Sequence, residues 1–170
     1  LTLKHHTSKL QDFSDLVSVE TFGFRGEALS SLCSLSDLTV TTRHASSDCG
    51  SRLVFDHNGL ITARTFVARQ VGSTVTLENI FSTLPVRQKE FHRNLKREFS
   101  KMTQLLYAYC LVSTGVKIIC TNQTKKGGRM TVAATQGCKS VRENIACVFG
   151  TKQLASLLEM KTVMPTSEML

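Results

Sequence analysis

Apolar positions along the chain repeat at two different spacings, which separate predicted helices from predicted strands. After Gly26 the apolar residues recur at helical spacing as far as Leu35, and Ser36 and Asp37 are expected to end that helix. Residues 38–42 are rich in β-branched side chains and predict a strand. This part of the chain is therefore expected to place a helix directly before a sheet.

Two further strand-like stretches, at residues 51–55 and 60–67, flank Asn58 and Gly59. An Asn-Gly pair is a strong hairpin signal, because both central residues of a type I′ turn need a positive φ. Another strand is predicted at 73–77. We expect these strands to form an antiparallel meander after the helix.

The longest helical pattern covers residues 94–113, and Gly115 is expected to end it. Its predicted apolar face comprises Leu95, Phe99, Met102, Leu105, Leu106, Ala108, Tyr109 and Val112. Strands are predicted at 116–121 and 130–134, across a Lys-Lys-Gly-Gly turn, and a last amphipathic helix at 140–149. The whole pattern predicts an α/β sandwich with helices on one face of a mixed sheet.

The stretch around the first helix start contains two glycines and an arginine. It reads Gly23-Phe24-Arg25-Gly26-Glu27-Ala28-Leu29. Glycine lets backbone amides approach a ligand because it carries no Cβ. A helix that begins at Glu27 directs unpaired N–H groups and its positive dipole end at an anion. Phosphate binding is one interpretation, and a loop that merely closes onto a core helix is the other, which the spacing alone favours.

Three other segments stand in the order that one family shows. They are His6-Thr7-Ser8-Lys9 before the glycine motif, and Gly72-Ser73-Thr74-Val75 and Leu84-Pro85-Val86-Arg87-Gln88-Lys89-Glu90-Phe91 after it. In this order the motifs resemble the N-terminal ATPase region of MutL mismatch-repair proteins, which belong to the GHKL ATPase class. The residues in and around these motifs look most like those of the eukaryotic PMS-type subunit. The resemblance covers nearly the whole chain and implies an internal piece of a longer protein.

The resemblance implies a GHKL/Bergerat-type ATPase fold with a mixed, largely antiparallel sheet. Residues 1–138 would form a partial ATPase domain with lid, phosphate loop and sheet, and residues 139–170 would begin a transducer domain of the ribosomal S5 domain 2-like fold. Within the first domain, residues 1–20 would belong to the lid over ATP, as a mobile surface segment with one short helix.

The same resemblance implies a set of nucleotide-binding residues. They are Thr7, Ser8, Lys9, Gly23, Phe24, Arg25, Gly26, Glu27, Ala28, Leu29 and Thr74. The hydroxyls of Thr7 and Ser8 and the ammonium of Lys9 can close over phosphate oxygens. Thr74, on a predicted strand, would reach the nucleotide from the sheet.

No residue of this chain is predicted to be catalytic or to bind metal. The family's general base is a glutamate in a Glu-x-x-x-Asn helix upstream of the glycine motif, and no such pair precedes Gly23. Glu27 is therefore expected to organise the loop or cap the helix. Arg25 either faces phosphate or pairs with a carboxylate to hold the loop. Mg²⁺ is expected with the ATP, with its ligand outside this chain.

The formal net charge of +8 favours an anionic partner such as nucleic acid. Basic residues crowd the stretch from Arg87 to Lys101, where Arg93, Lys96, Arg97 and Lys101 are predicted to bind DNA phosphates without base readout. A solvated helix face is the alternative. The chain has no Trp, so base stacking on a single strand is not suggested.

The chain has six cysteines, which show neither Cys-x-x-Cys pairs nor zinc-finger spacing. They are Cys33, Cys49, Cys110, Cys120, Cys138 and Cys147. We expect buried, reduced thiols in a reducing compartment. No apolar run approaches membrane-spanning length, so no membrane association is expected.

These features lead to three hypotheses of function. In the first, the chain is part of a PMS-type MutL protein that binds and hydrolyses ATP to drive lid closure and dimerisation with an MLH-type homologue on DNA. That protein would act in the nucleus after MutS-type proteins recognise a mismatch, and the isolated fragment would not turn over ATP. The second is a non-catalytic DNA-binding or assembly module from a truncated MutL relative. The third is another GHKL protein, and the Phe-Arg-Gly-Glu-Ala-Leu sequence argues against it because it resembles the MutL motif.

Overall fold

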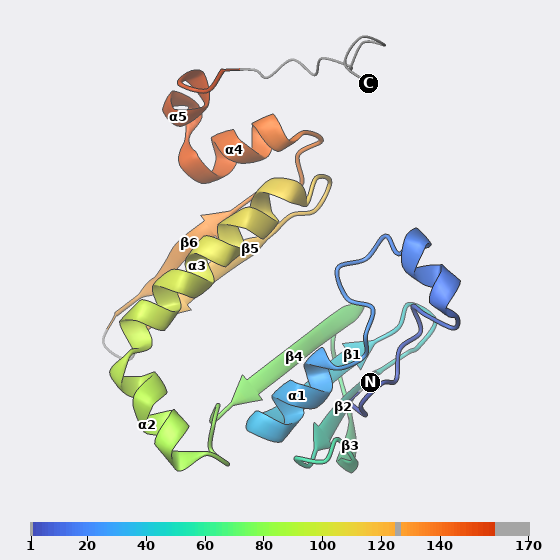
Figure 1. The fold of residues 1–170 in the computed structure, drawn as a ribbon. Coiled ribbons are helices and arrows are strands. Elements are labelled where there is room, and N and C mark those ends of the chain that lie inside the picture. Colours follow the sequence, from blue (N-terminus) through green and yellow to red (C-terminus); the bar gives the residue numbers. More distant parts are fainter. Residues whose placement is uncertain (1, 125–126, 159–170) are drawn as a thin grey trace. The chain divides into compact units, whose positions relative to one another are not determined.

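The computed structural model describes residues 2–124 and 127–158 (Figure 1). The chain divides into two compact units, one up to Arg93 and one from Asn94 onwards, and each is described by itself. Three predicted features lie partly outside the described residues: the first residue of the lid, positions 125–126 of the Lys-Lys-Gly-Gly turn, and residues 159–170 of the transducer domain. The predicted domain boundary after residue 138 stays a prediction.

The first helix forms where the sequence pattern predicts it. α1 (Ala28–Leu35) lies against the sheet of the first unit (Figure 1). Its Cys33 side chain packs with Leu38, Val40 and Phe55 in a core in which each of these residues is at most 9% exposed. The apolar spacing of the helix thus supplies one half of this core, and the alternating strand residues supply the other.

The first unit contains one antiparallel sheet with the strand order β3-β2-β1-β4. Its strands are β1 (Asp37–Arg43), β2 (Gly50–Phe55), β3 (Ile61–Val67) and β4 (Gly72–Glu78). Every pairing between described strands is antiparallel, which agrees with the predicted α/β class and its largely antiparallel sheet.

The predicted meander is wrong at its last strand, because β4 pairs with β1 and not with β3. Arg69, in the connection from β3 to β4, holds this crossing. Its guanidinium donates to the carbonyl oxygen of Thr41, and Arg43 Nη1 donates to the carbonyl oxygen of Arg69 at 2.8 Å. These long-range hydrogen bonds tie the connection to the end of β1 and direct β4 to its free edge.

The predicted hairpin forms, but its turn is not type I′. Among the two central residues only Gly59 has a positive φ, at 85°. The Asp56 carboxylate accepts hydrogen bonds from the backbone N–H groups of Asn58 (3.0 Å) and Leu60 (2.8 Å), and Gly59 N donates to Asp56 O at 3.0 Å. The side chain of Asp56 therefore selects a longer loop with one left-handed glycine.

The N-terminal segment is anchored to this hairpin turn. Thr2 is 3% exposed, and its hydroxyl donates to the carbonyl oxygen of Gly59 at 2.6 Å. The predicted short helix appears as the 3₁₀ helix η1 (Phe13–Ser18), which begins with a capping box between Asp12 and Asp15. Hydrogen bonds from the backbone N–H groups of Asp12 and Gln11 lower the pKa of Asp15.

α2 (Pro85–Arg93) is a helix that the sequence pattern did not predict. It begins with proline, which suits a first helical position because no N–H is needed there. The Phe91 ring packs edge-on against the Phe81 ring, with 5.4 Å between the ring centroids. The guanidinium of Arg87 lies 4.6 Å from the centroid of the Phe81 ring. Phe81 N also donates to Leu35 O at 2.6 Å, so α2 is docked through Phe81 onto α1.

The second unit contains α3 (Leu95–Val112), a two-stranded sheet, α4 (Val141–Phe149) and α5 (Thr151–Ala155). The sheet pairs β5 (Ile119–Gln123) with β6 (Arg129–Ala134). β5 begins later than predicted, at Ile119. Ile118 N donates to the buried hydroxyl of Thr135 at 3.0 Å in place of a strand carbonyl, while Ile118 O still accepts from Thr135 N at 2.8 Å.

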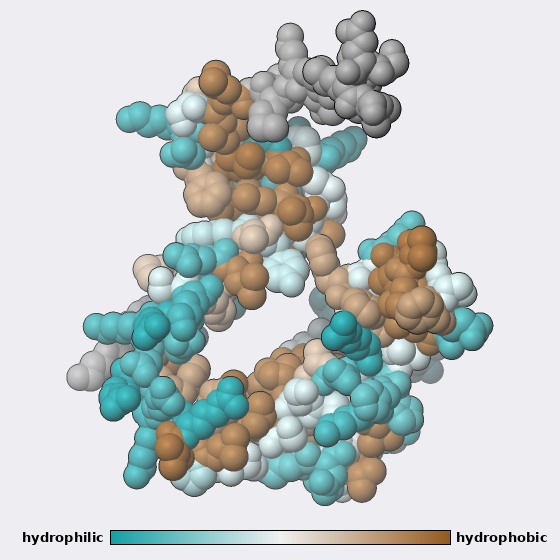
Figure 2. Space-filling model, in the orientation of Figure 1, coloured by the Kyte–Doolittle hydropathy of each residue, from teal (hydrophilic) through white to brown (hydrophobic). Residues whose placement is uncertain are grey.

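The predicted apolar face of α3 is largely exposed in the described structure. Cys110 is fully buried, whereas Leu105 is 61% exposed. Apolar side chains also gather on the surface over α4 and α5 (Figure 2), where Val141 and Phe149 are exposed. No helix within residues 2–124 and 127–158 is long and apolar enough to cross a bilayer.

Candidate functional site

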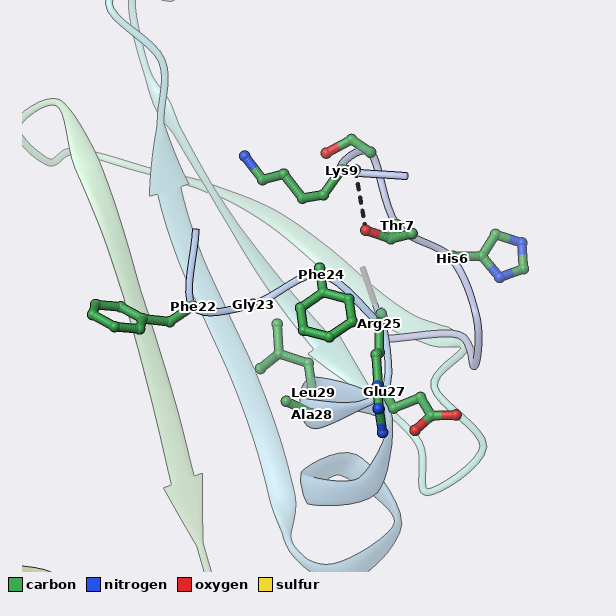
Figure 3. Close-up of a pocket in the computed structure, with 12 residues that line it drawn as sticks. His6, Thr7, Lys9, Phe22, Gly23, Phe24, Arg25, Glu27, Ala28 and Leu29 are labelled. Carbon is green, nitrogen blue, oxygen red and sulfur yellow. Dashed lines mark hydrogen bonds between the residues drawn. The ribbon is translucent and has the colours of Figure 1, made fainter. Parts of the chain in front are cut away.

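A pocket of about 700 Å³ lies where two separate segments of the first unit meet at the start of α1 (Figure 3). Its lining residues are His6, Thr7, Ser8, Lys9, Phe22, Gly23, Phe24, Arg25, Gly26, Glu27, Ala28 and Leu29. The pocket therefore brings together every predicted nucleotide-binding residue except Thr74. We call residues 2–9 the lid segment and residues 22–29 the glycine loop.

Gly26 is the point of closest approach between the lid segment and the glycine loop. Its φ is +68°, and a Cβ on it would lie 2.4 Å from the carbonyl oxygen of His6. Only glycine fits both the left-handed backbone and this contact. A Cβ on Gly23 would meet nothing within 4 Å, so Gly23 leaves its side of the loop open. The two glycines thus have different roles, which their spacing did not reveal.

Glu27 connects the same two parts of the chain through its side chain. Its Oε1 lies 3.2 Å from Nδ1 of His5, and the two side chains are 48% and 77% exposed. The Glu27 side chain makes no capping hydrogen bond to α1. Of the two predicted roles, the geometry thus supports loop organisation and not capping. An exposed pair of this kind contributes little to stability, so its effect is on the position of the loop.

His5 is a residue of this site that the sequence analysis missed. It has a positive φ of 63°, which is uncommon for a residue other than glycine. His6 beside it also contributes through its backbone, because its carbonyl oxygen contacts Gly26. No local pattern marks either histidine, since both contacts join residues about twenty positions apart.

The lid segment presents hydroxyl and ammonium groups at the pocket. Thr7 Oγ1 accepts a hydrogen bond from Lys9 N at 3.1 Å, which shapes a short turn and leaves the hydroxyl hydrogen available for another acceptor (Figure 3). Ser8 and Lys9 are exposed. This set of donors suits an anion such as phosphate.

Arg25 projects its guanidinium from the glycine loop, pointing away from Lys9 (Figure 3). Its Cζ lies 5.4 Å from the Phe24 ring centroid, a cation–π distance. Within the described part of the chain Arg25 makes no ion pair with a carboxylate. The alternative in which a carboxylate holds Arg25 is therefore not seen here, and contact with phosphate stays a prediction.

The N-terminus of α1 faces the pocket through Ala28 and Leu29. The first backbone hydrogen bond of the helix runs from Ser31 N to Glu27 O at 2.9 Å. The N–H groups before Ser31 thus have no acceptor inside the helix, and they carry its positive dipole end. Together with Lys9 they make a donor set that suits phosphate oxygens. No three His, Cys, Asp or Glu residues in the described ranges are arranged to hold a metal ion.

Thr74 lies on β4 and does not line the pocket. It pairs with Thr41, while its neighbour Val75 pairs with Val40. Val40 belongs to the core beneath α1. Because side chains alternate between the faces of a strand, Thr74 points to the face away from α1. A contact between Thr74 and nucleotide stays a prediction.

The predicted DNA-binding residues belong to both units. Arg93 ends α2 in the first unit, whereas Lys96, Arg97 and Lys101 lie on α3 in the second. All are exposed, and Lys101 Nζ pairs with Glu98 Oε1 at 2.9 Å. DNA binding by these residues stays a prediction.

The cysteines fall into different environments. Cys33 and Cys110 are buried as predicted, and burial raises the pKa of both thiols. Cys33 Sγ also donates to the carbonyl oxygen of Asp56 at 2.9 Å. Cys49 and Cys147 are exposed, so the expectation of buried thiols is wrong for these two.

The chain is similar to a curated mismatch repair protein along almost its whole length. It is 57% identical over 166 residues to the mismatch repair endonuclease PMS2 of Homo sapiens, which covers 98% of this chain and 19% of that relative. The chain thus spans less than a fifth of that protein. No model of a protein family matches the chain.

Two solved structures share the fold. A crystal structure of the N-terminal domain of a DNA repair protein superposes with a TM-score of 0.73 at 40% identity, over 88% of this chain and 42% of that chain. The MutL ATPase domain of Aquifex aeolicus, complexed with ADP, superposes with a TM-score of 0.58 at 22% identity, over 82% and 52% of the two chains, and this likeness concerns the fold alone. By sequence and fold, the chain belongs to the MutL family of DNA mismatch repair proteins, and it is similar to PMS-type members of that family.

Proposed function

We propose that the intact protein binds ATP in the pocket between the lid segment and the glycine loop, and hydrolyses it to drive lid closure and dimerisation on DNA. The single observation that carries this proposal is the pocket itself. It joins two separate segments, and its lining contains ten of the eleven predicted nucleotide-binding residues, beside the N-terminus of a helix. The ADP bound to the related MutL ATPase domain supports a nucleotide as the ligand.

Each part of the pocket has a distinct task in this proposal. The amides at the start of α1 and the open backbone at Gly23 bind phosphate oxygens. Lys9 and Arg25 neutralise phosphate charge, while Thr7 and Ser8 donate hydroxyl hydrogen bonds. Bound Mg²⁺ would supply further neutralisation of the phosphates, with its protein ligand outside this chain. A general base outside this chain would activate the attacking water.

Closure of the lid would be transmitted through the contacts already present at the glycine loop. The His6 carbonyl oxygen abuts Gly26, and His5 pairs with Glu27. A movement of the lid segment therefore displaces the start of α1, the element that binds phosphate in this proposal. The hydrogen bond from the Thr2 hydroxyl to Gly59 O anchors the other end of the lid segment, so in this proposal the segment moves about that anchor.

The remaining parts of the proposal concern the intact protein. It would dimerise with an MLH-type homologue, act in the nucleus after MutS-type mismatch recognition, and bind DNA phosphates through Arg93, Lys96, Arg97 and Lys101. Residues 1–138 would belong to the ATPase domain and residues 139–170 would begin the transducer domain. The mismatch repair relatives support this setting.

The test is ATP binding and turnover by the 170-residue chain beside a chain extended at both ends. We expect the extended protein to bind a fluorescent ATP analogue and to hydrolyse ATP, and the 170-residue chain to show no turnover. Absence of nucleotide binding by both proteins would reject the ATPase proposal. DNA binding retained in that case would favour the non-catalytic DNA-binding or assembly module.

A further inference from the structure

Two thiols of the second unit lie side by side although nine positions separate them in sequence. Cys138 Sγ and Cys147 Sγ are 3.6 Å apart. Cys138 follows β6 and is half-buried, whereas Cys147 lies on α4 and is exposed. Neither residue takes part in the proposed nucleotide or DNA sites.

The backbone around the pair is fixed by hydrogen bonds. The carbonyl oxygen of Cys138 accepts a hydrogen bond from Gly115 N at 2.7 Å. The Ser140 side chain caps α4 by accepting from Glu143 N at 3.2 Å, and Lys139 N donates to Glu143 Oε2 at 3.1 Å. These contacts determine both where Cys138 lies and where α4 begins, so the folded chain keeps the two sulfur atoms close.

We propose that Cys138 and Cys147 are a redox modification site, which forms an intramolecular disulfide by exchange with a low-molecular-weight disulfide such as oxidised glutathione. Formation of the disulfide requires the sulfur atoms to approach from 3.6 Å to a bond of about 2.0 Å.

The exchange has two steps. The Cys147 thiolate attacks one glutathione sulfur, which breaks the glutathione disulfide and releases one glutathione thiolate. The Cys138 thiolate then attacks the Cys147 sulfur of the mixed disulfide and releases the second glutathione thiolate. The two protein thiols are oxidised, the glutathione disulfide is reduced to two thiols, and the protons of both cysteines pass to the leaving thiolates through solvent.

The order of attack follows from exposure and charge. Cys147 is exposed, so it meets the reagent first. The hydrogen bond that Cys138 shares with Cys147 raises the pKa of Cys138, which disfavours Cys138 as the first nucleophile. Once Cys147 is in the mixed disulfide that hydrogen bond is lost, and Cys138 is the resolving thiol. Cys49 is also exposed but has no thiol partner among the described residues, so it serves as an internal reference.

The disulfide would restrain the start of α4. It closes the chain between residues 138 and 147 and links the residue bonded to Gly115 with the second half of the helix. If residue 139 begins the transducer domain, as the proposed function has it, the bond crosses the joint between the two domains. The chemistry of the pair itself does not depend on that division.

The first experiment maps the disulfide directly. The 170-residue chain is equilibrated in buffers of reduced and oxidised glutathione, quenched with acid, alkylated and digested with trypsin. Lys139 and Arg142 lie between the two cysteines, so trypsin separates them and a disulfide appears as a cross-linked pair of peptides. We expect this cross-link at oxidant levels at which Cys49 is still alkylated or carries glutathione. Glutathione or alkyl adducts on both cysteines, without a cross-link, would overturn the proposal.

A second experiment tests proximity without oxidation. Phenylarsine oxide binds two thiols that lie close together, and we expect the reduced chain to bind it at the pair. Binding is expected to be lost in Cys138→Ser and in Cys147→Ser and to be kept in Cys49→Ser, with circular dichroism spectra that match the parent chain. Equal binding by all three variants would show that the two thiols do not act together.

Discussion

The carbonyl oxygen of His6 lies in the space that a side chain on Gly26 would occupy, 2.4 Å from the position of a Cβ atom. This contact joins the lid segment to the glycine loop at the mouth of the pocket. Gly26 therefore allows the lid segment to pack against the glycine loop. This role is separate from the one predicted from the sequence, in which a glycine lets backbone amides approach a phosphate.

Gly26→Ala is expected to detach the lid segment while the sheet stays folded. The substitution adds a clash with His6 and strain at a φ of +68°, together about 1–3 kcal/mol of local destabilisation. Hydrogen exchange of the amides of residues 4–9 in the 170-residue chain should rise, with little change in the melting temperature. Gly23→Ala is the matched control, because its Cβ meets nothing within 4 Å. Equal exchange in the two variants would contradict the role given to Gly26.

Arg25→Ala is expected to weaken ATP binding by the extended protein and to leave its melting temperature unchanged. A hydrogen bond to a charged group contributes about 1.5–3 kcal/mol, which corresponds to about tenfold or more in affinity. Arg64→Ala removes a comparable arginine, which lies 5.7 Å from the Phe66 ring on β3 and outside the pocket. ATP titration of both variants tests this, and an unchanged affinity in Arg25→Ala would assign Arg25 to loop support alone.

Arg69→Ala is expected to destabilise the first unit by about 2 kcal/mol, because it removes charged hydrogen bonds from the β3–β4 crossing. The Arg69 guanidinium donates to the carbonyl oxygen of Thr41 across this crossing. Arg52→Ala, on the exposed part of β2, should change stability little. Urea unfolding of the 170-residue chain measures both. If Arg69→Ala were no more destabilising than Arg52→Ala, the crossing would be held by strand pairing alone.

Neutralising the predicted DNA-binding residues together is expected to flatten the salt dependence of DNA binding by the extended protein. The variant replaces Arg93, Lys96, Arg97 and Lys101 by Gln. Loss of these phosphate contacts would reduce the slope of log K against log salt by about 3 to 4 for duplex DNA.

A control with the same change in net charge separates local contact from overall charge. It replaces four exposed basic residues of the second unit, Lys117, Lys139, Arg142 and Lys152. The control should keep most of the slope. If the slope of log K against log salt falls equally in the two variants, the cluster from Arg87 to Lys101 is a solvated face and does not contact DNA.

Local pattern was enough to predict most elements of the fold. α1, the strands of the first sheet and α3 lie within a few residues of their predicted positions, because helical and alternating spacings are properties of neighbouring residues. α2 was not predicted, because most residues of Pro85–Arg93 are polar and form no apolar repeat at helical spacing.

The residues of the candidate pocket were grouped from their motifs, whereas the turn beside it was predicted with the wrong geometry, and nucleotide binding in the pocket stays a prediction. The glycine loop and the lid segment were recognised from their motifs, and the structure brings them into one pocket. The turn at Gly59 was predicted with the wrong geometry, because the Asp56 carboxylate binds two backbone N–H groups that the Asn-Gly signal does not include. Thr74 was predicted to bind nucleotide because of its motif. Its pairing with Thr41 puts its side chain on the face of the sheet that points away from α1.

The sequence by itself determined the kinds of elements, the motif order and the family resemblance, because each depends on residues that are close along the chain. Only the tertiary structure decided that β4 pairs with β1, that His6 contacts Gly26, and that Cys138 meets Cys147. These contacts join residues that local spacing does not relate. They form only when the path of the whole chain is fixed by packing and by long-range hydrogen bonds such as those of Arg69.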